Sequence, residues 1–95
     1  MEDLEALRLE IVDVTIEILK LVKKRLELAR EAKRIKALKG LPIKDESAER
    51  RLLSKVRETC EELNIFPELG EELTKLLIKY SIKIQEEDEQ SGSEV

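Results

Sequence analysis

Hydrophobic residues recur at alternating spacings of three and four along the first third of the chain. Counted from Leu4, these apolar side chains stand at positions 4, 7, 11, 14, 18, 21, 28, 32 and 35. Such spacing places them in one stripe along a helix. Gly40 can adopt the left-handed conformation that ends a helix, and Pro42 prevents its continuation. The pattern therefore predicts one long helix over residues 3–39.

Two further helices are predicted after this break. Asp45 is suited to cap the second helix, which Asn64 ends, and its apolar face comprises residues 48, 52, 53, 56, 60 and 63. Pro67 is well placed in the first turn of the third helix, whose apolar face comprises residues 69, 73, 76, 77, 80 and 84. The acidic segment 86–95 has almost no apolar residue, so we expect a disordered tail after a helical domain at 1–85.

The length of the first helix predicts assembly into a dimer. A helix of about 36 residues is about 54 Å long, whereas a compact domain of this chain length has a diameter of about 32 Å. The stripe is apolar over nearly its whole length, so a second chain must cover the part that projects. The expected fold is all-α, with three-helix subunits intertwined as a homodimer in which the long helices cross.

Composition narrows the possible functions. The 95 residues are 41% hydrophobic and 42% charged, with a formal net charge of −4, which argues against a general nucleic-acid binder and against a membrane protein. The chain has no His, which removes His-based catalysis and nearly all zinc sites, and we expect no metal and no cofactor. A lone Cys60, interpreted as buried packing, and the absence of a signal-peptide pattern predict a cytoplasmic protein.

Polar residues interrupt the expected core. Arg25 occupies a stripe position, where a buried guanidinium must reach solvent, pair with a carboxylate or bind an anionic ligand. Lys36, eleven residues later, returns to the same face, and the small residues Ala29 and Ala32 lie between them. This arrangement predicts an anion pocket, although an ordinary charged helix margin remains the alternative.

Similar anomalies occur on the other two helices. Glu49 lies on or beside the apolar face of the second helix and could simply pair with Arg25. Ser81 and Gln85 continue the apolar line of the third helix, although Gln is also common near helix ends. Arg8 is about 25 Å from Arg25 along the helix, so it cannot serve the same pocket in one chain. An antiparallel crossing near residues 16–19 would bring it to the site of the partner.

These residues together resemble the all-helical chorismate mutase family over residues 4–85. The similar stretches are LRLEI, KKRLELA, AKRIK, LPIKDESAER and YSIKIQ, in this order and without gaps. The resemblance implies a dimer without cofactor that converts chorismate to prephenate, the branch step toward phenylalanine and tyrosine.

The resemblance also implies a role for each candidate residue. Arg25 and the partner's Arg8 would bind the two substrate carboxylates, and Lys36 and Gln85 would donate to the ether oxygen. The Glu49 carboxylate would accept a hydrogen bond from the ring hydroxyl, with help from the main chain of Asp45. Ser81 would make a supporting contact near a substrate carboxylate.

One residue departs from the family pattern. Many relatives carry an arginine at the position of Ala48, directly before Glu49, and the role of Lys44 stays open. Two alternative functions remain: an isochorismate-pyruvate lyase with a similar cationic pocket, and a non-catalytic helical dimerisation module in which Arg25 and Glu49 form a buried ion pair.

Overall fold

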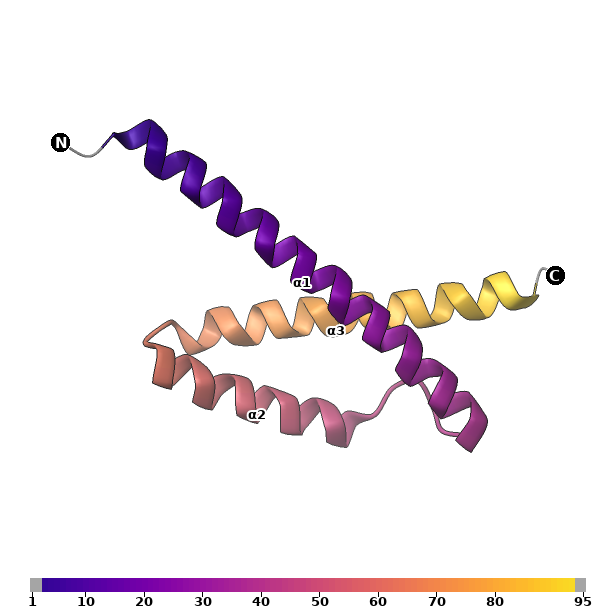
Figure 1. Ribbon diagram of the computed structural model, residues 1–95. Helices are drawn as coiled ribbons and strands as arrows, with labels where there is room; N and C mark the ends of the chain where they lie inside the picture. The colour runs from indigo at the N-terminus through magenta and orange to yellow at the C-terminus, as the bar shows by residue number, and fades with distance from the viewer. Residues whose placement is uncertain (1–2, 94–95) are drawn as a thin grey trace.

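The protein folds into three helices and their short connections. A computed structural model describes the backbone of residues 3–93 and the side chains of residues 3–87. The helices are α1 (Leu4–Lys39), α2 (Glu46–Leu63) and α3 (Pro67–Ser93), as Figure 1 shows. The described part of the chain contains no strand, so the predicted all-α class is confirmed.

The ends of α1 and α2 lie where the sequence predicts them. Gly40 closes α1 in the left-handed conformation, with φ of 67°. Asp45 caps α2 by accepting a hydrogen bond from the backbone N–H of Ala48 at 3.1 Å, and Asn64 ends that helix with φ of 62°. Local capping chemistry therefore sets these boundaries.

The end of α3 differs from the prediction. The backbone of residues 86–93 is helical, so the helix end predicted at Gln85 is wrong. Glu and Gln have good helix propensity and no proline occurs in this segment, which lets the helix continue past the last apolar stripe position, Ile84. The division into a domain at 1–85 and a tail at 86–95 stays a prediction, and residues 94–95 lie outside the described residues.

Helix α3 is the element that holds the subunit together, because it packs against both α1 and α2. Helices α2 and α3 form a hairpin, and α1 crosses it so that its N-terminal half projects beyond the other two helices (Figure 1). The radius of gyration is 17.1 Å, compared with about 12 Å for a compact domain of this length. Within residues 3–93, no helix has both the length and the apolar composition needed to cross a membrane.

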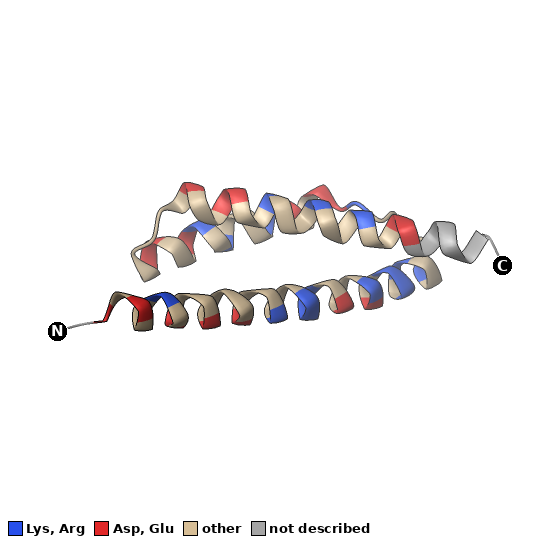
Figure 2. Cartoon of the chain, turned by 90° about the horizontal axis from the view of Figure 1, so that it is seen from above, with Lys and Arg blue, Asp and Glu red and all other residues tan. Residues whose placement is uncertain are grey.

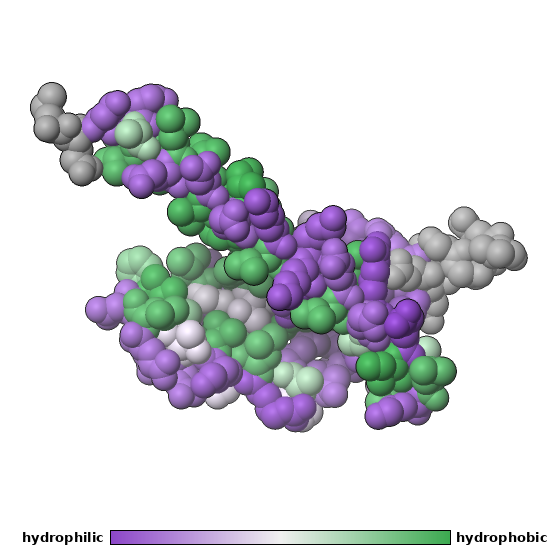
Figure 3. Space-filling model, in the orientation of Figure 1, coloured by the Kyte–Doolittle hydropathy of each residue, from purple (hydrophilic) through white to green (hydrophobic). Residues whose placement is uncertain are grey.

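The projecting half of α1 exposes its apolar stripe. Every residue from Leu4 to Leu21 is exposed; Ile11, for example, retains 64% of its accessible surface. Figure 3 shows apolar side chains on this half of α1 and on the hairpin next to it. The predicted apolar faces of α2 and α3 are also only partly covered, with Leu73 46% and Leu76 50% exposed. Within a single subunit these faces therefore stay largely exposed, because only α3 packs against both of the other helices.

The buried side chains of the described subunit form a short list: Ala29, Cys60, Thr74 and Gln85. The interpretation of Cys60 as a buried packing residue is thereby confirmed. Thr74 and Gln85 are polar, so most of the apolar residues have no dry core of their own in a single subunit. This is the burial pattern expected of a chain whose core is completed by another surface.

A close approach of α2 to α3 gives the first testable prediction. A Cβ atom on Gly70 would lie 2.3 Å from the Cys60 Sγ and 3.0 Å from the Val56 Cγ1. Gly70→Ala should therefore lower the free energy of unfolding by about 1–2 kcal/mol, despite the better helix propensity of Ala. Urea denaturation measures this change.

A double variant serves as the control for that prediction. Cys60→Ala removes the closest atom, so Gly70→Ala should cost measurably less when introduced into Cys60→Ala than when introduced into the unchanged protein. Equal costs in the two backgrounds, or a stabilising Gly70→Ala substitution, would show that the helix spacing is not limited by this contact.

Candidate active site

A cavity of about 150 Å³ lies between the C-terminal half of α1, the segment before α2, the first turns of α2 and the C-terminal part of α3. Six of the seven predicted site residues line it, although they are as many as 60 positions apart in the sequence. These six are Arg25, Lys36, Asp45, Glu49, Ser81 and Gln85. The fold therefore gathers side chains from all three helices around one cavity.

Arg25 is anchored to α3 through one nitrogen of its guanidinium. Its Nη1 donates to the hydroxyl oxygen of Ser81 and to the main-chain carbonyl of Leu77, the latter at 3.3 Å. The Ser81 hydroxyl in turn donates to the Leu77 carbonyl at 2.9 Å. A guanidinium has five N–H donors, so those on Nε and Nη2 are not used by these contacts and can bind a carboxylate in the bidentate manner.

Gln85 is the most deeply buried polar residue of the cavity, with 4% of its surface exposed. Its Nε2 donates to the main-chain carbonyl of Ala29 at 2.9 Å, which ties α3 to α1. The second N–H of this amide is not used by that bond. The Oε1 atom has no hydrogen-bond partner among the described residues, an arrangement that is costly in a closed core.

Lys36 is oriented by the segment that connects α1 to α2. Its Nζ donates to the main-chain carbonyl of Ile43, which leaves two of the three ammonium hydrogens for other acceptors. Glu49 stands at the cavity wall in the first turn of α2, and its backbone N–H donates to the Asp45 carbonyl at 3.0 Å. The cavity thus has donors on α1 and α3 and a carboxylate on α2.

The interpretation of Arg25 and Glu49 as a buried ion pair finds no support in the described residues. Arg25 directs its contacts to α3, and no ion pair joins the two side chains in that part of the chain. Both residues are half-buried at the cavity. Their opposite charges therefore face a shared cavity rather than each other.

Several expectations about the lining need correction. Ala29 and Ala32 do not line the cavity; Ala29 is buried where α1 meets α3, because a small side chain lets the two helices come close. The apolar wall is formed instead by residues that the sequence analysis did not single out for the site, namely Ile43, Ala48, Leu52, Ile78 and Ile82. The predicted apolar face of the third helix did not include Ile78 and Ile82, which lie one turn apart beside Ser81.

Arg8 is the predicted site residue that lies outside the cavity. It is exposed on the projecting half of α1, with its Nη1 3.9 Å from the Glu5 carboxylate. This position agrees with the expectation that Arg8 cannot reach the cavity of its own chain. Arg51 also points elsewhere, because it donates to the Ser47 hydroxyl at 2.6 Å, so it does not replace the arginine that relatives carry at the position of Ala48.

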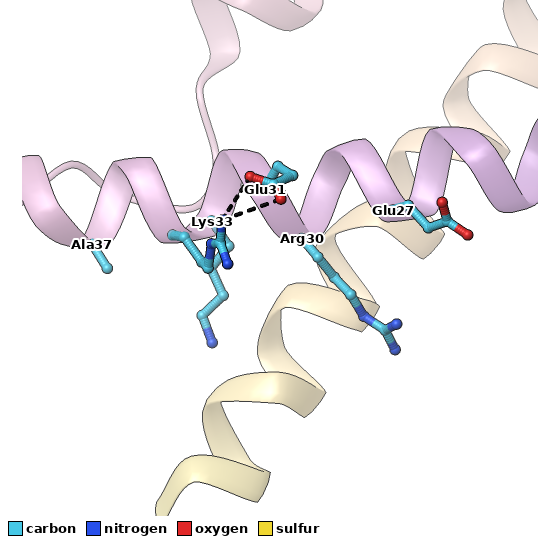
Figure 4. A pocket seen from close by; sticks show the side chains of 6 residues that line it. Glu27, Arg30, Glu31, Lys33 and Ala37 are labelled. Atoms are coloured by element: carbon cyan, nitrogen blue, oxygen red, sulfur yellow. Dashed lines mark hydrogen bonds and ion pairs between the residues drawn. The ribbon is translucent and has the colours of Figure 1, made fainter.

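A second, larger hollow of about 480 Å³ lies on another side of the C-terminal half of α1. Figure 4 shows its charged side chains, of which Arg34 and Glu31 form an ion pair at 2.9 Å. Acidic and basic side chains alternate here, and none of the predicted site residues is among them. This is the arrangement of a solvated helix surface.

The sequence matches the model of the family described as chorismate mutase type II over residues 7–86. The chain belongs to the chorismate mutase type II family. A curated chorismate mutase from Methanocaldococcus jannaschii is 30% identical over 87 residues, which cover 92% of this chain and 88% of that protein. The resemblance inferred from the sequence is thereby confirmed, and the chain is an intramolecular isomerase. The matched region includes all six cavity residues and Arg8.

Proposed function

We propose that the cavity between α1, α2 and α3 is the active site in which this chorismate mutase converts chorismate to prephenate. The observation that carries this proposal is the convergence of Arg25, Lys36, Glu49 and Gln85 on one cavity with donors left over. The reaction is a Claisen rearrangement within a single molecule, so it needs a compact substrate conformer and stabilisation of developing charge rather than a nucleophile or a base.

The two substrate carboxylates are held by two arginines. Arg25 binds one of them through its Nε and Nη2 hydrogens, while its Nη1 stays on Ser81 and Leu77. Because this anchor fixes the guanidinium before the substrate arrives, less rotamer entropy is lost on binding. Arg8 of the partner subunit binds the other carboxylate, which draws the enolpyruvyl side chain over the ring.

Lys36 and Gln85 stabilise the negative charge that develops on the ether oxygen in the transition state. Each of these side chains already donates one hydrogen to a main-chain carbonyl, of Ile43 and of Ala29, and each has a further hydrogen to donate. One remaining hydrogen of each side chain is directed to the ether oxygen, on which negative charge grows as the carbon–oxygen bond breaks. These interactions strengthen in the transition state and therefore increase kcat.

The remaining polar groups orient the ring. The Glu49 carboxylate accepts a hydrogen bond from the ring hydroxyl, next to the main chain of Asp45 where α2 begins. Ser81 supports the binding of the first carboxylate through Arg25, because its hydroxyl oxygen accepts a hydrogen bond from Nη1 and holds the guanidinium in place. The apolar side chains of Ile78 and Ile82 exclude water from the same space, which strengthens the electrostatic interactions.

The site is completed by a second copy of the chain in an intertwined homodimer. A cavity of 150 Å³ is about half the lower size of pockets that enclose a ligand of drug size, and none of its lining residues lies on the projecting half of α1. The exposed apolar half of α1 is the surface available to supply it. An antiparallel crossing of the two α1 helices near residues 16–19 covers this stripe and brings Arg8 to the partner's cavity.

The direct test is an assay of the purified protein with chorismate. Loss of the ultraviolet absorbance of chorismate, with prephenate identified as the product, is the expected result. A parallel assay with isochorismate distinguishes the lyase alternative, which would release pyruvate. No turnover of chorismate by the folded protein would contradict the proposed function.

Mixing two variants tests the composite site. Arg8→Ala and Arg25→Ala should each be nearly inactive, but subunit exchange forms mixed dimers in which one of the two sites has both arginines. An equal mixture should therefore regain about a quarter of the original activity, since about half of the dimers are mixed. Activity that stays at the level of the separate variants would contradict the contribution of Arg8 from the partner.

A further inference from the structure

Helix α1 is divided into an acidic half and a basic half. Residues 3–17 contain five acidic side chains and one basic side chain, Arg8, whereas residues 20–39 contain nine basic and two acidic side chains. Figure 2 shows the acidic residues toward the N-terminus of α1 and the basic residues toward its C-terminus. The change of sign falls between Glu17 and Lys20, which is also where the proposed crossing lies.

The helix dipole does not account for this division. Dipole effects fade within the first and last turns, but the acidic half extends over four turns and the basic half over more than five. Pairing inside the helix does not account for it either. Glu10 and Lys24 are exposed and have no charged partner among the described residues of their own chain.

Two copies of such a helix attract one another in only one orientation. Parallel copies would place acidic on acidic and basic on basic residues, whereas antiparallel copies that cross near the change of sign place opposite charges together. We propose that this charge division fixes the antiparallel register of the dimer and that, through it, ionic strength controls how completely the active site is assembled. The proposal rests on the dimer described above, because Arg8 reaches the partner's cavity only in this register.

One pair of residues makes the proposal specific. Glu10 and Lys24 each stand directly before a stripe position and so lie on the same flank of α1. Residues on the same flank face each other across an antiparallel helix pair. A crossing centred at Glu17 places Glu10 opposite the partner's Lys24, and the two-fold symmetry repeats this contact.

The same register brings the two copies of Glu17 together at the crossing. Lys20 offsets this repulsion, because its Nζ lies 3.2 Å from the Glu17 carboxylate in the same chain. The pair of Glu10 contacts is therefore the attractive element near the crossing, and it can be reversed without changing any residue of the cavity.

Charge reversal tests the proposal. Glu10→Lys and Lys24→Glu should each raise the dimer dissociation constant by about tenfold to a hundredfold at low salt, because each replaces two attractive contacts by two repulsive ones. Sedimentation velocity without substrate measures this. The effect should nearly vanish in 1 M salt, where the screening length is about 3 Å.

Mixing the two variants gives the decisive result. A mixed dimer of Glu10→Lys with Lys24→Glu has opposite charges at both contacts, so the mixture should associate at least as tightly as the unchanged protein, and its activity should return with association. The control is the matched pair Glu58→Lys and Lys55→Glu on α2, whose ion pair at 3.9 Å is exposed. These controls carry the same changes in net charge and should not alter dimerisation.

Either of two results from the variants would overturn the proposal: reversal variants that dimerise as tightly as the controls, or a mixture no tighter than its components. A monomeric unchanged protein would overturn it as well. This test is independent of the test of the proposed function, because dimer association is measured without substrate. A protein that associates as expected but leaves chorismate unchanged would contradict only the proposed function.

Discussion

Replacing Arg25 by leucine should lower kcat/KM about a thousandfold and leave the protein folded. The loss of a charged group that binds a carboxylate inside a cavity typically costs a few kcal/mol of binding energy, and each 1.4 kcal/mol corresponds to a factor of ten. The fold should tolerate the change because leucine makes the stripe continuous. Ser81 also keeps its bond to the Leu77 carbonyl when Arg25 is removed, so no buried hydroxyl loses all its partners.

The matched control for this prediction is Arg34→Leu. Arg34 lies on the same helix and lines the exposed hollow of about 480 Å³, where it pairs with Glu31. The same chemical change at this position should leave kcat/KM within about twofold, since surface ion pairs contribute little. Full activity of the Arg25→Leu enzyme would remove Arg25 from the site, and equal losses in both variants would point to a general effect of charge.

Replacing Gln85 by glutamate should make activity depend strongly on pH. At pH 8 a carboxylate at this position cannot donate to the ether oxygen and would face the Ala29 carbonyl as a second acceptor. The rate should fall by about a hundredfold or more there, which is typical for the loss of a donor to a developing oxyanion. At acidic pH the protonated carboxyl donates again, so the rate should rise by about tenfold for each unit of pH decrease until the group is protonated.

The free energy of unfolding of the Gln85→Glu variant should also decrease as the pH rises. Burial and the Ala29 carbonyl both raise the pKa of the introduced carboxyl above its value in the unfolded chain. Between the two values the folded state binds more protons, so the free energy of unfolding decreases as the pH rises. Circular dichroism at each pH separates loss of fold from loss of rate.

The control for the glutamate variant is Gln85→Leu, which should be slow at every pH because it has neither a donor nor a titrating group. A Gln85→Glu enzyme with undiminished activity at pH 8 would contradict the assigned role of Gln85. So would a leucine variant whose pH profile matches that of the glutamate variant.

The helix boundaries could be predicted because they depend on local chemistry. Gly40, Asp45 and Asn64 cap the helices by contacts within a few residues, and the sequence contains all of that information. The end of α3 could not be placed in the same way. Beyond Gln85 the sequence has neither a proline nor a further apolar stripe position up to residue 93, so it gives no signal of where the helix stops.

The polar members of the site could be predicted because a polar side chain on an apolar stripe is anomalous. Arg25 and Gln85 were found for this reason, and the structure places both at the cavity. The apolar lining could not be predicted, because Ile78 and Ile82 lie outside the apolar face expected for the third helix, and nothing in an isoleucine side chain distinguishes a cavity wall from ordinary packing. The contact of Gln85 with the Ala29 carbonyl depends on how closely α1 approaches α3, which the sequence does not specify.

The most direct measurement is a crystal structure of the protein with a rigid bicyclic dicarboxylate that mimics the transition state. The expected result is a dimer in which Arg25 binds one carboxylate, Arg8 of the partner subunit binds the other, and Lys36 and Gln85 both donate to the ether oxygen. A structure in which Arg25 and Lys36 face bulk water with nothing bound between them would contradict the composite cavity.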